Sequence, residues 1–253
     1  MSLTATFDNT RQVGRGIAGA LLIAVIWELS ARGFNLPSYI LPSISSIVSG
    51  LIRDSAMLLE ATRYTAVEAF TGYAIGALAG ISLAVLVSMV PGVRGVALPL
   101  ATAINSVPVV AYSPLVLLWF GMGMSSKIVM VAIAVSFTIF LSTLAGLDRV
   151  DRRSVDLIRS FGASRLALLW RLRLPTALPL IIAGLRVSTV RSVLVAIVTE
   201  MLGAYGGLGW VIYQATLQID FVKVWAAIIV ASAISLLFFG AISFVERRYI
   251  FWR

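Results

Sequence analysis

The chain has 253 residues, of which 60% are hydrophobic and only 12% are charged. The charged fraction is about half that of an average globular protein, which indicates a polytopic membrane protein without a soluble catalytic domain. Because neither cysteine nor histidine is present, thiol catalysis, disulfides, Ser-His and Cys-His dyads and the commonest transition-metal ligands are excluded. We predict no catalytic residues and no metal site. The net charge of +9 is explained more simply by arginines that orient membrane spans than by nucleic-acid binding.

Apolar runs long enough to cross a bilayer recur along the whole chain. We predict an all-α protein with a single transmembrane domain over residues 1–253. A polar tail over residues 1–13 precedes the first run, which lacks the charged start and cleavage pattern of a signal peptide and is predicted to be an uncleaved span. An amphipathic segment over residues 44–52 lies in the linker to the second span. About six spans are predicted, at residues 16–31, 65–90, 96–120, 127–145, 176–201 and 222–245.

Glycines and prolines distinguish two of these spans. Gly72, Gly76 and Gly80 recur every four residues in the second span, and such small residues let a neighbouring helix approach backbone to backbone. The third span contains three of the eight prolines. This density predicts a kinked or broken helix, which is tolerated at membrane depth only where the backbone is buried in protein or lines a cavity.

One long polar segment, about residues 148–175, separates the fourth and fifth predicted spans. Seven of the 20 basic residues lie in this segment, at positions 149, 152, 153, 159, 165, 171 and 173. It is too charged to cross a bilayer, yet it retains two short amphipathic helical patterns that meet at Phe161-Gly162-Ala163. We predict that this segment, hereafter the elbow, lies at the membrane surface and docks on a cytoplasmic partner.

In the elbow, Asp156 is followed by Gly162 six positions later, and Leu172 precedes Leu174 and Pro175. This spacing resembles the coupling-loop signature of binding-protein-dependent ABC importer permeases. The segments SFGAS, LPTALPLIIAGLR and TEMLGAYGGLG are similar to the nitrate/sulfonate/taurine branch of that family, and the resemblance extends from residue 37 to the end. The family usually opens its signature with Glu-Ala-Ala, whereas this chain has Asp-Leu-Ile, so we expect helix packing there to differ in detail.

The resemblance implies a type I ABC importer permease, a non-catalytic subunit of the bacterial cytoplasmic (inner) membrane. Similar proteins act as a pair of permease chains, here expected to be a homodimer, with two cytoplasmic ATPase subunits and an extracytoplasmic substrate-binding protein. Because this chain has no Walker A sequence, ATP and Mg²⁺ are expected on the partner ATPase and no cofactor on this chain. The implied ATPase-coupling residues are Asp156, Ser160, Phe161, Gly162, Ala163, Leu172, Leu174 and Pro175.

Three of these residues also suit a rigid connection on physical grounds. Gly162 permits a tight turn that a Cβ would disfavour. Pro175 suits the first turn of the fifth span, where its missing amide needs no partner. Asp156 is predicted near the N-terminus of the short helix, where a negative charge is favoured. The alternative is a basic loop that only fixes the membrane topology.

Two arginines lie inside the fifth predicted span, where a charge is costly unless it is paired or hydrated. Arg186 is close enough to the start of that span to snorkel toward the membrane surface. Arg191 lies nearer the middle of the span. It either faces a translocation pathway and meets an anion, or forms an ion pair with Glu28 or Glu68.

Further polar residues complete two candidate sites. Those of the substrate pathway, which could instead hold helices together, are Asn105, Ser106, Tyr112, Ser113, Ser188 and Arg191. After the fifth span, Glu200, Tyr205 and Trp210 are predicted to form an outer gate or a docking surface. The alternative for this second group is interfacial capping and an aromatic belt.

Charge asymmetry orients the predicted spans. Six spans leave both termini on one side, and the segments on that side hold 13 lysines and arginines against five on the other. The positive-inside rule therefore places both termini and the elbow in the cytoplasm.

These patterns predict the permease subunit of an ATP-driven importer whose small solute arrives on a binding protein. The branch resemblance and Arg191 favour an anion such as a sulfonate, taurine or nitrate. Related permeases also carry pyrimidine-type vitamin precursors and riboflavin-like aromatics, so a neutral substrate is the alternative. An ion-coupled secondary transporter would need buried acids and often internal repeats, and an intramembrane enzyme would need converging catalytic groups. The sequence offers few buried acids, no matching halves and no converging pair.

Overall fold

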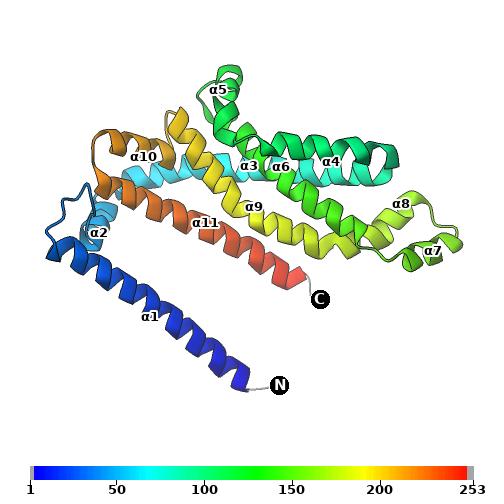
Figure 1. The fold of residues 1–253 in the computed structure, drawn as a ribbon, viewed down its shortest axis with the longest axis horizontal. Helices are drawn as coiled ribbons and strands as arrows, with labels where there is room; N and C mark the ends of the chain where they lie inside the picture. The colour runs from blue at the N-terminus through cyan, green and yellow to red at the C-terminus, as the bar shows by residue number, and fades with distance from the viewer. Residues whose placement is uncertain (1–2, 250–253) are drawn as a thin grey trace.

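The computed structural model describes residues 3–249, which form helices joined by short connections (Figure 1). No strand occurs among these described residues, and the all-α prediction is confirmed. The helices are α1 Leu3–Gly33, α2 Ile44–Arg53, α3 Ser55–Met89, α4 Pro91–Ser106, α5 Val109–Phe120, α6 Met124–Asp148, α7 Arg152–Ser160, α8 Arg165–Leu168, the π-helical turn η1 Leu169–Arg173, α9 Leu174–Leu202, α10 Leu208–Leu217 and α11 Phe221–Tyr249.

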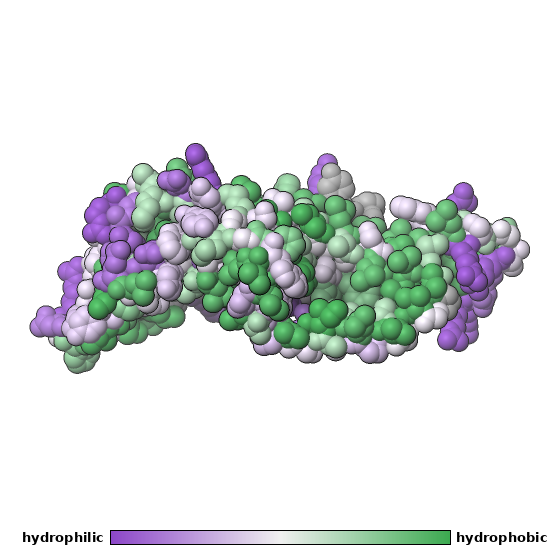
Figure 2. Space-filling view, turned by 90° about the horizontal axis from the view of Figure 1, so that it is seen from above, coloured by the Kyte–Doolittle hydropathy of each residue, from purple (hydrophilic) through white to green (hydrophobic). Residues whose placement is uncertain are grey.

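The prediction of about six spans is confirmed. Within the described chain, five helices are long and apolar enough to cross a membrane, and the bent pair α4–α5 makes a sixth crossing if it counts as one span. Figure 2 shows hydrophilic residues gathered toward the two ends of the long axis and hydrophobic residues over the middle. This distribution suits a body whose long axis crosses the bilayer.

The two ends of this axis carry different elements. The elbow helices α7 and α8 lie at one end, and α2 and α10 lie at the other (Figure 1). The N-terminal end of α1 and the C-terminal end of α11 both point toward the elbow end. An even number of crossings produces this arrangement.

Helices α3, α6 and α9 form the core of the molecule. Gly72, Gly76 and Gly80 lie on the face of α3 that touches α6, and a Cβ on any of the three would come within 2.5–2.6 Å of an α6 atom. Real Cβ atoms do not approach so closely, so only glycine allows this contact. The small-residue ridge predicted from the sequence therefore packs α3 directly against α6.

The third predicted span is broken, as its prolines indicate. α4 ends at Ser106, α5 begins at Val109, and the two helices meet at an angle of 91°. Val107 has an extended backbone, with ψ at 121°, because the ring of Pro108 disfavours the helical region for the residue before it. The other two prolines of this span lie inside α4 and α5.

The first helix lies apart from the core (Figure 1). It is attached near its C-terminal end, where the Trp27 indole donates to the Pro42 carbonyl at 2.8 Å. The same ring packs edge-on against Trp225, with 4.7 Å between the centroids. The large apolar side chains of this helix are mostly exposed, as expected of a surface that faces lipid.

The structure departs from the predicted boundaries at three places. α1 already begins at Leu3, because no glycine or proline interrupts the residues predicted as a tail. α3 begins at Ser55, well before the predicted start of the second span. The glycine-rich connection before α11 contains the helix α10, which the glycines at 203–209 concealed. The amphipathic segment is helical as predicted, and Ser43 caps it as α2.

Candidate functional site

The elbow is built from two short helices that meet at a glycine. Asp151 caps α7, since its side chain accepts a hydrogen bond from a backbone amide of the first turn. The prediction that Asp156 occupies this end is therefore wrong, because Asp156 lies inside α7. Gly162 has φ at +80°, which glycine adopts without the cost of a Cβ, and Ser164 then caps α8. The predicted tight turn at Gly162 is confirmed.

Large apolar side chains are exposed along the elbow. Phe161 is 81% exposed and Trp170 is 65% exposed, and both Leu157 and Leu166 are more than half exposed. Leu169 instead turns inward and packs with residues of α6 and α9. An exposed apolar patch of this kind marks a contact surface for a protein or a membrane.

The elbow joins the fifth span as one continuous helix, Arg165–Leu202. In the π-helical turn η1, the Leu174 amide donates to the carbonyl of Leu169. Pro175 follows in the first turn of α9, as predicted. Because α8 and α9 are not separated by a loop, a displacement of the elbow is transmitted directly to α9.

An ion pair ties the broken span to the base of the elbow. The Arg94 guanidinium at the start of α4 donates through both Nη atoms to the carboxylate of Asp148, the last residue of α6, at 2.8 and 2.7 Å. Both side chains are partly exposed. The pair positions the start of α4 against the end of α6.

Arg191 lies beside the break between α4 and α5. Its Nη1 donates to Thr138 Oγ1 and its Nη2 to Asn105 Oδ1, each at 3.1 Å. A small cavity of about 20 Å³ lies at the break, and Asn105, Tyr112 and Arg191 are its polar lining residues. The other lining residues are apolar. Within the described residues Arg191 forms no ion pair, so its partners there are neutral.

The alternative ion pairs for Arg191 do not occur. Glu28 is bound by Arg32 at 2.7 Å and by the hydroxyl of Ser45 at 2.8 Å. Glu68 contacts Glu200, which lies near the C-terminal end of α9, away from the elbow. An intramembrane guanidinium without a counter-ion among residues 3–249 is available to an external anion.

The structure brings together only part of the predicted pathway. Asn105, Tyr112 and Arg191 converge at the break. Ser113 and Ser188 are fully buried, and the Ser113 hydroxyl donates to a carbonyl of its own helix. The remaining predicted pathway residue is Ser106, whose hydroxyl also donates within its own helix.

Arg186 is held by an ion pair rather than by snorkelling. Its Nη1 donates to Glu246 Oε2 of α11 at 2.8 Å. The guanidinium carbon also lies 5.6 Å from the centroid of the Phe239 ring. Arg186 therefore joins α9 to α11. The sequence predicted that Arg186 extends toward the membrane surface, whereas its guanidinium pairs with the carboxylate of Glu246, 60 positions along the chain.

A buried polar cluster lies at the end of the molecule that carries α10, hereafter the α10 end. Its members are Thr65, Glu68, Lys127 and Glu200, none more than 2% exposed. Thr65 donates to Glu200 Oε1 at 2.7 Å, and the Lys127 ammonium donates to the carbonyls of Met122 and Gly203. Glu200 is therefore an internal anchor. Its burial contradicts the predicted place on a docking surface, and its predicted part in an outer gate stays a prediction.

This cluster fixes the start of α10. The Gly209 amide donates to Glu200 Oε2 at 2.6 Å, and the Leu208 amide donates to Thr65 Oγ1 at 2.8 Å. Gly207 has φ at +101°, and a Cβ there would collide with the Glu200 carboxyl group. Sequence reasoning missed Thr65 and Lys127. The signal available for Lys127 was a charge placed at the start of an apolar run.

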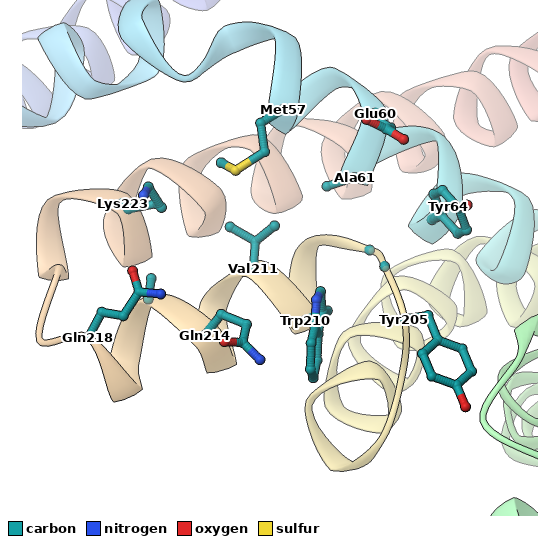
Figure 3. Close-up of a pocket in the computed structure, with 13 residues that line it drawn as sticks. Met57, Glu60, Ala61, Tyr64, Tyr205, Trp210, Val211, Gln214, Gln218 and Lys223 are labelled. Atoms are coloured by element: carbon teal, nitrogen blue, oxygen red, sulfur yellow. The ribbon is translucent and has the colours of Figure 1, made fainter.

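Above the cluster, a cavity of about 340 Å³ opens between α3, α10 and the preceding loop (Figure 3). In Figure 3, Glu60 and Tyr64 on α3 stand across the cavity from Trp210 and Gln214 on α10. Tyr205 is 78% exposed. The predicted outer residues Tyr205 and Trp210 thus line an accessible surface, whereas Glu200 lies beneath it.

The rim of the α10 end carries paired charges. Arg53 donates to Asp54 at 2.9 Å, and this contact lowers the pKa of the Asp54 carboxyl group. Lys223, which lines the same cavity, lies 3.4 Å from Asp220.

These features define a class: a multi-pass helical membrane protein with a broken third crossing, an intramembrane arginine at the break, and an exposed elbow continuous with a core helix. The comparisons identify the family. The chain belongs to the binding-protein-dependent transport system inner membrane components, whose family model matches residues 72–251. It is an ABC importer permease, a non-catalytic transport component of the inner membrane.

Three relatives illustrate the match. The chain is 33% identical over 234 residues to a "Probable ABC transporter permease protein" of Haemophilus influenzae, covering 92% of this chain and 95% of the relative. It is 35% identical over 235 residues to the formylaminopyrimidine transport permease protein ThiX of Halalkalibacterium halodurans (92% and 93% covered). It is 29% identical over 251 residues to the taurine transport system permease protein TauC of Escherichia coli (96% and 91% covered).

A solved structure shares the fold. A chain from the crystal structure of an amino acid ABC transporter superposes with a TM-score of 0.65 and 20% identity, covering 78% of this chain and 96% of that chain. The type I importer fold predicted from the sequence is confirmed.

Proposed function

We propose that this permease carries a small anion of the sulfonate, taurine or nitrate kind in an ATP-driven importer. The observation that carries the proposal is Arg191, whose guanidinium lies in a span at the break of the third crossing with neutral partners among the described residues. Arg191 is only partly buried, but a guanidinium inside a membrane span is costly without a counter-ion. A sulfonate, nitrate or carboxylate group supplies the missing charge through paired N–H···O bonds.

In the proposed assembly, two copies of the chain pair and two cytoplasmic ATPase subunits bind the two elbows. A binding protein delivers the solute from outside, and both termini lie in the cytoplasm. ATP and Mg²⁺ act on the ATPase subunits, with no cofactor on this chain. When ATP binding closes the two ATPase subunits on each other, the elbow moves. The continuous helix Arg165–Leu202 transmits this movement to Arg191. The cavity then opens outward to accept solute.

The second candidate substrate is a neutral pyrimidine-type vitamin precursor. The formylaminopyrimidine permease among the relatives favours it, because that protein has the highest identity of the three described above. Binding to the partner binding protein separates the two candidates. Saturable binding of taurine, an alkanesulfonate or nitrate supports the anion, and selective binding of a formylaminopyrimidine contradicts it.

Uptake into proteoliposomes tests the role of Arg191. Arg191→Gln should lower transport at least about tenfold, because one charge-assisted pair is worth about 1.5–3 kcal/mol. Arg191→Lys should retain part of the activity. Arg15→Gln removes an equal charge from an exposed position on α1, outside the elbow and the break, and serves as the control. Normal transport by Arg191→Gln would exclude the anion site.

Recovery of the ATPase from native membranes tests the elbow. Phe161→Ala removes the most exposed ring of the elbow and should reduce co-purification of the ATPase, and Gly162→Trp should abolish it. Phe34→Ala is the matched control, since Phe34 is 78% exposed but lies outside the elbow. Equal recovery with Phe161→Ala, Gly162→Trp and Phe34→Ala would contradict docking at the elbow.

The absence of native cysteine makes the topology directly testable. Ser160→Cys in the elbow should react with a membrane-impermeant maleimide only from the cytoplasmic side. Gln218→Cys at the α10 end should react only from the outside. Labelling of both from one side would refute the proposed orientation.

A further inference from the structure

Three arginines of the elbow converge on one cavity beside the end of α3. The cavity measures about 130 Å³. Its basic side chains come from three different elements: Arg159 from α7, Arg165 from α8 and Arg173 from η1. Ser88 and Met89, from the last turn of α3, and the leucines at 168 and 169 complete its wall, and no carboxylate lines it.

The positive charges of this cavity are not neutralised by the described part of the chain. None of the three arginines takes part in an ion pair there. The Nε of Arg173 is buried without a hydrogen-bond partner. Two carboxylates, Asp148 and Asp156, line a neighbouring cavity that Arg159 and Arg173 also line. Asp148 is bound by Arg94, and Asp156 forms no ion pair with these arginines among the described residues.

Three guanidinium groups around one small cavity favour an anion with several acceptor oxygens. The planar fork of arginine binds the oxygens of phosphate in pairs. A concave surface lined by a single sign of charge also concentrates counter-ions. A buried Nε donor without a partner adds a specific demand for an acceptor.

The level of the cavity indicates where that anion comes from. Met89 is the last residue of the membrane-spanning helix α3, so the cavity lies where the apolar part of the molecule ends. Trp170 and Leu166, neighbours in sequence of its lining residues, are largely exposed. An exposed tryptophan beside basic residues is typical of the headgroup layer.

We propose that Arg159, Arg165 and Arg173 bind the phosphate group of an anionic lipid headgroup. Bound there, the headgroup links α7, α8 and η1 to the end of α3 and fixes the elbow at the membrane surface. The proposal rests on the placement of the elbow given under the proposed function. It requires no ATPase, so it can fail while ATPase recovery succeeds, and the reverse.

Lipid binding to the full chain in nanodiscs or detergent, measured by native mass spectrometry, tests the proposal. The probes are phosphatidylglycerol, phosphatidylcholine and inorganic phosphate. Wild type should bind phosphatidylglycerol in preference to phosphatidylcholine. The double variant Arg159→Gln with Arg165→Gln should weaken that binding about 30-fold, at about tenfold for each 1.4 kcal/mol and about 1 kcal/mol per basic residue.

The matched control removes the same charge from the same segment. Arg149→Gln with Arg171→Gln changes two elbow arginines that line neither cavity, and it should bind phosphatidylglycerol as wild type does. An equal loss of phosphatidylglycerol binding in both double variants would show that only the net charge of the elbow matters, and it would overturn the proposed site. Inorganic phosphate that binds and displaces phosphatidylglycerol would overturn the lipid as the source.

A second variant covers a failure of the glutamine pair to assemble. Arg159→Lys with Arg165→Lys keeps the charge but loses the paired hydrogen bonds. It should weaken phosphatidylglycerol binding several-fold. Unchanged binding would contradict recognition by guanidinium groups.

Discussion

The two ends of the molecule place charged and apolar side chains in opposite ways. At the α10 end, Glu68, Lys127 and Glu200 are buried together, each at most 2% exposed. At the elbow end, arginines surround open cavities and large apolar side chains such as Phe161 face outward. Buried charge is tolerated only where partners satisfy it, and exposed apolar surface persists where a partner covers it.

This difference separates a part that one chain completes from a part that it leaves open. The α10 end supplies most of its own donors and acceptors, from α3, α6, α9 and α10, and leaves Glu68 Oε2 without a hydrogen-bond partner among the described residues. The elbow end supplies one side of an interface. Substitutions at the α10 end should therefore change stability, and substitutions at the elbow should change association.

The largest effect is expected from Lys127→Met. The change removes the ammonium from beside two buried carboxyl groups and leaves the carbonyls of Met122 and Gly203 without their donor. Breaking a buried ionic cluster costs about 3–5 kcal/mol, measured as the free energy of unfolding in detergent. Lys223→Met is the control, since Lys223 belongs to a partly exposed pair and should cost about 1 kcal/mol or less. Similar losses in the free energy of unfolding for Lys127→Met and Lys223→Met would contradict the role of the buried cluster in stability.

An intermediate effect compares two glycines with positive φ. Gly207→Ala should cost about 2–4 kcal/mol, because backbone strain adds to a collision with the Glu200 carboxyl group. Gly162→Ala should cost about 1 kcal/mol, because φ is also positive but no atom lies within 4 Å of the added Cβ. Thermal unfolding measures both. A larger loss at Gly162 than at Gly207 would contradict the assignment of stability to the α10 end.

The smallest effect is expected from Arg94→Gln. Its ion pair with Asp148 is partly exposed, so the loss should be about 0.2–1 kcal/mol and should shrink as salt is added. Unfolding at low and high ionic strength checks this. A loss that is large and independent of salt would show that the base of the elbow is as closed as the α10 end.

The fold was largely predictable because its signals are local. Apolar runs, the prolines of the third span and the glycine spacing of α3 each act within a few turns of helix. The elbow was recognisable for the same reason, since Gly162 and its neighbours form one short motif.

The residues that sequence reasoning misplaced depend on distant partners. Glu200 is bound by Thr65, which lies 135 positions away, and Lys127 is bound by a carbonyl 76 positions away. Arg186 similarly finds Glu246 across 60 positions. The hydrophobic periodicity of a sequence carries no information about such long-range contacts. Asp156 was misplaced for a smaller reason, because α7 begins four residues earlier at Arg152, directly after its cap Asp151.

The glycine contact between α3 and α6 also determines where this protein can deform. Two helices whose backbones touch at Gly72, Gly76 and Gly80 cannot slide past each other without collisions, so α3 and α6 behave as one stiff strut. Spin labels placed on these two helices should keep a constant separation through a transport cycle. Labels on α5, which follows the Val107–Pro108 break, and on α9, whose Arg191 lies beside it, should report a change. The constant separation of α3 and α6 then serves as an internal length standard for these distance measurements.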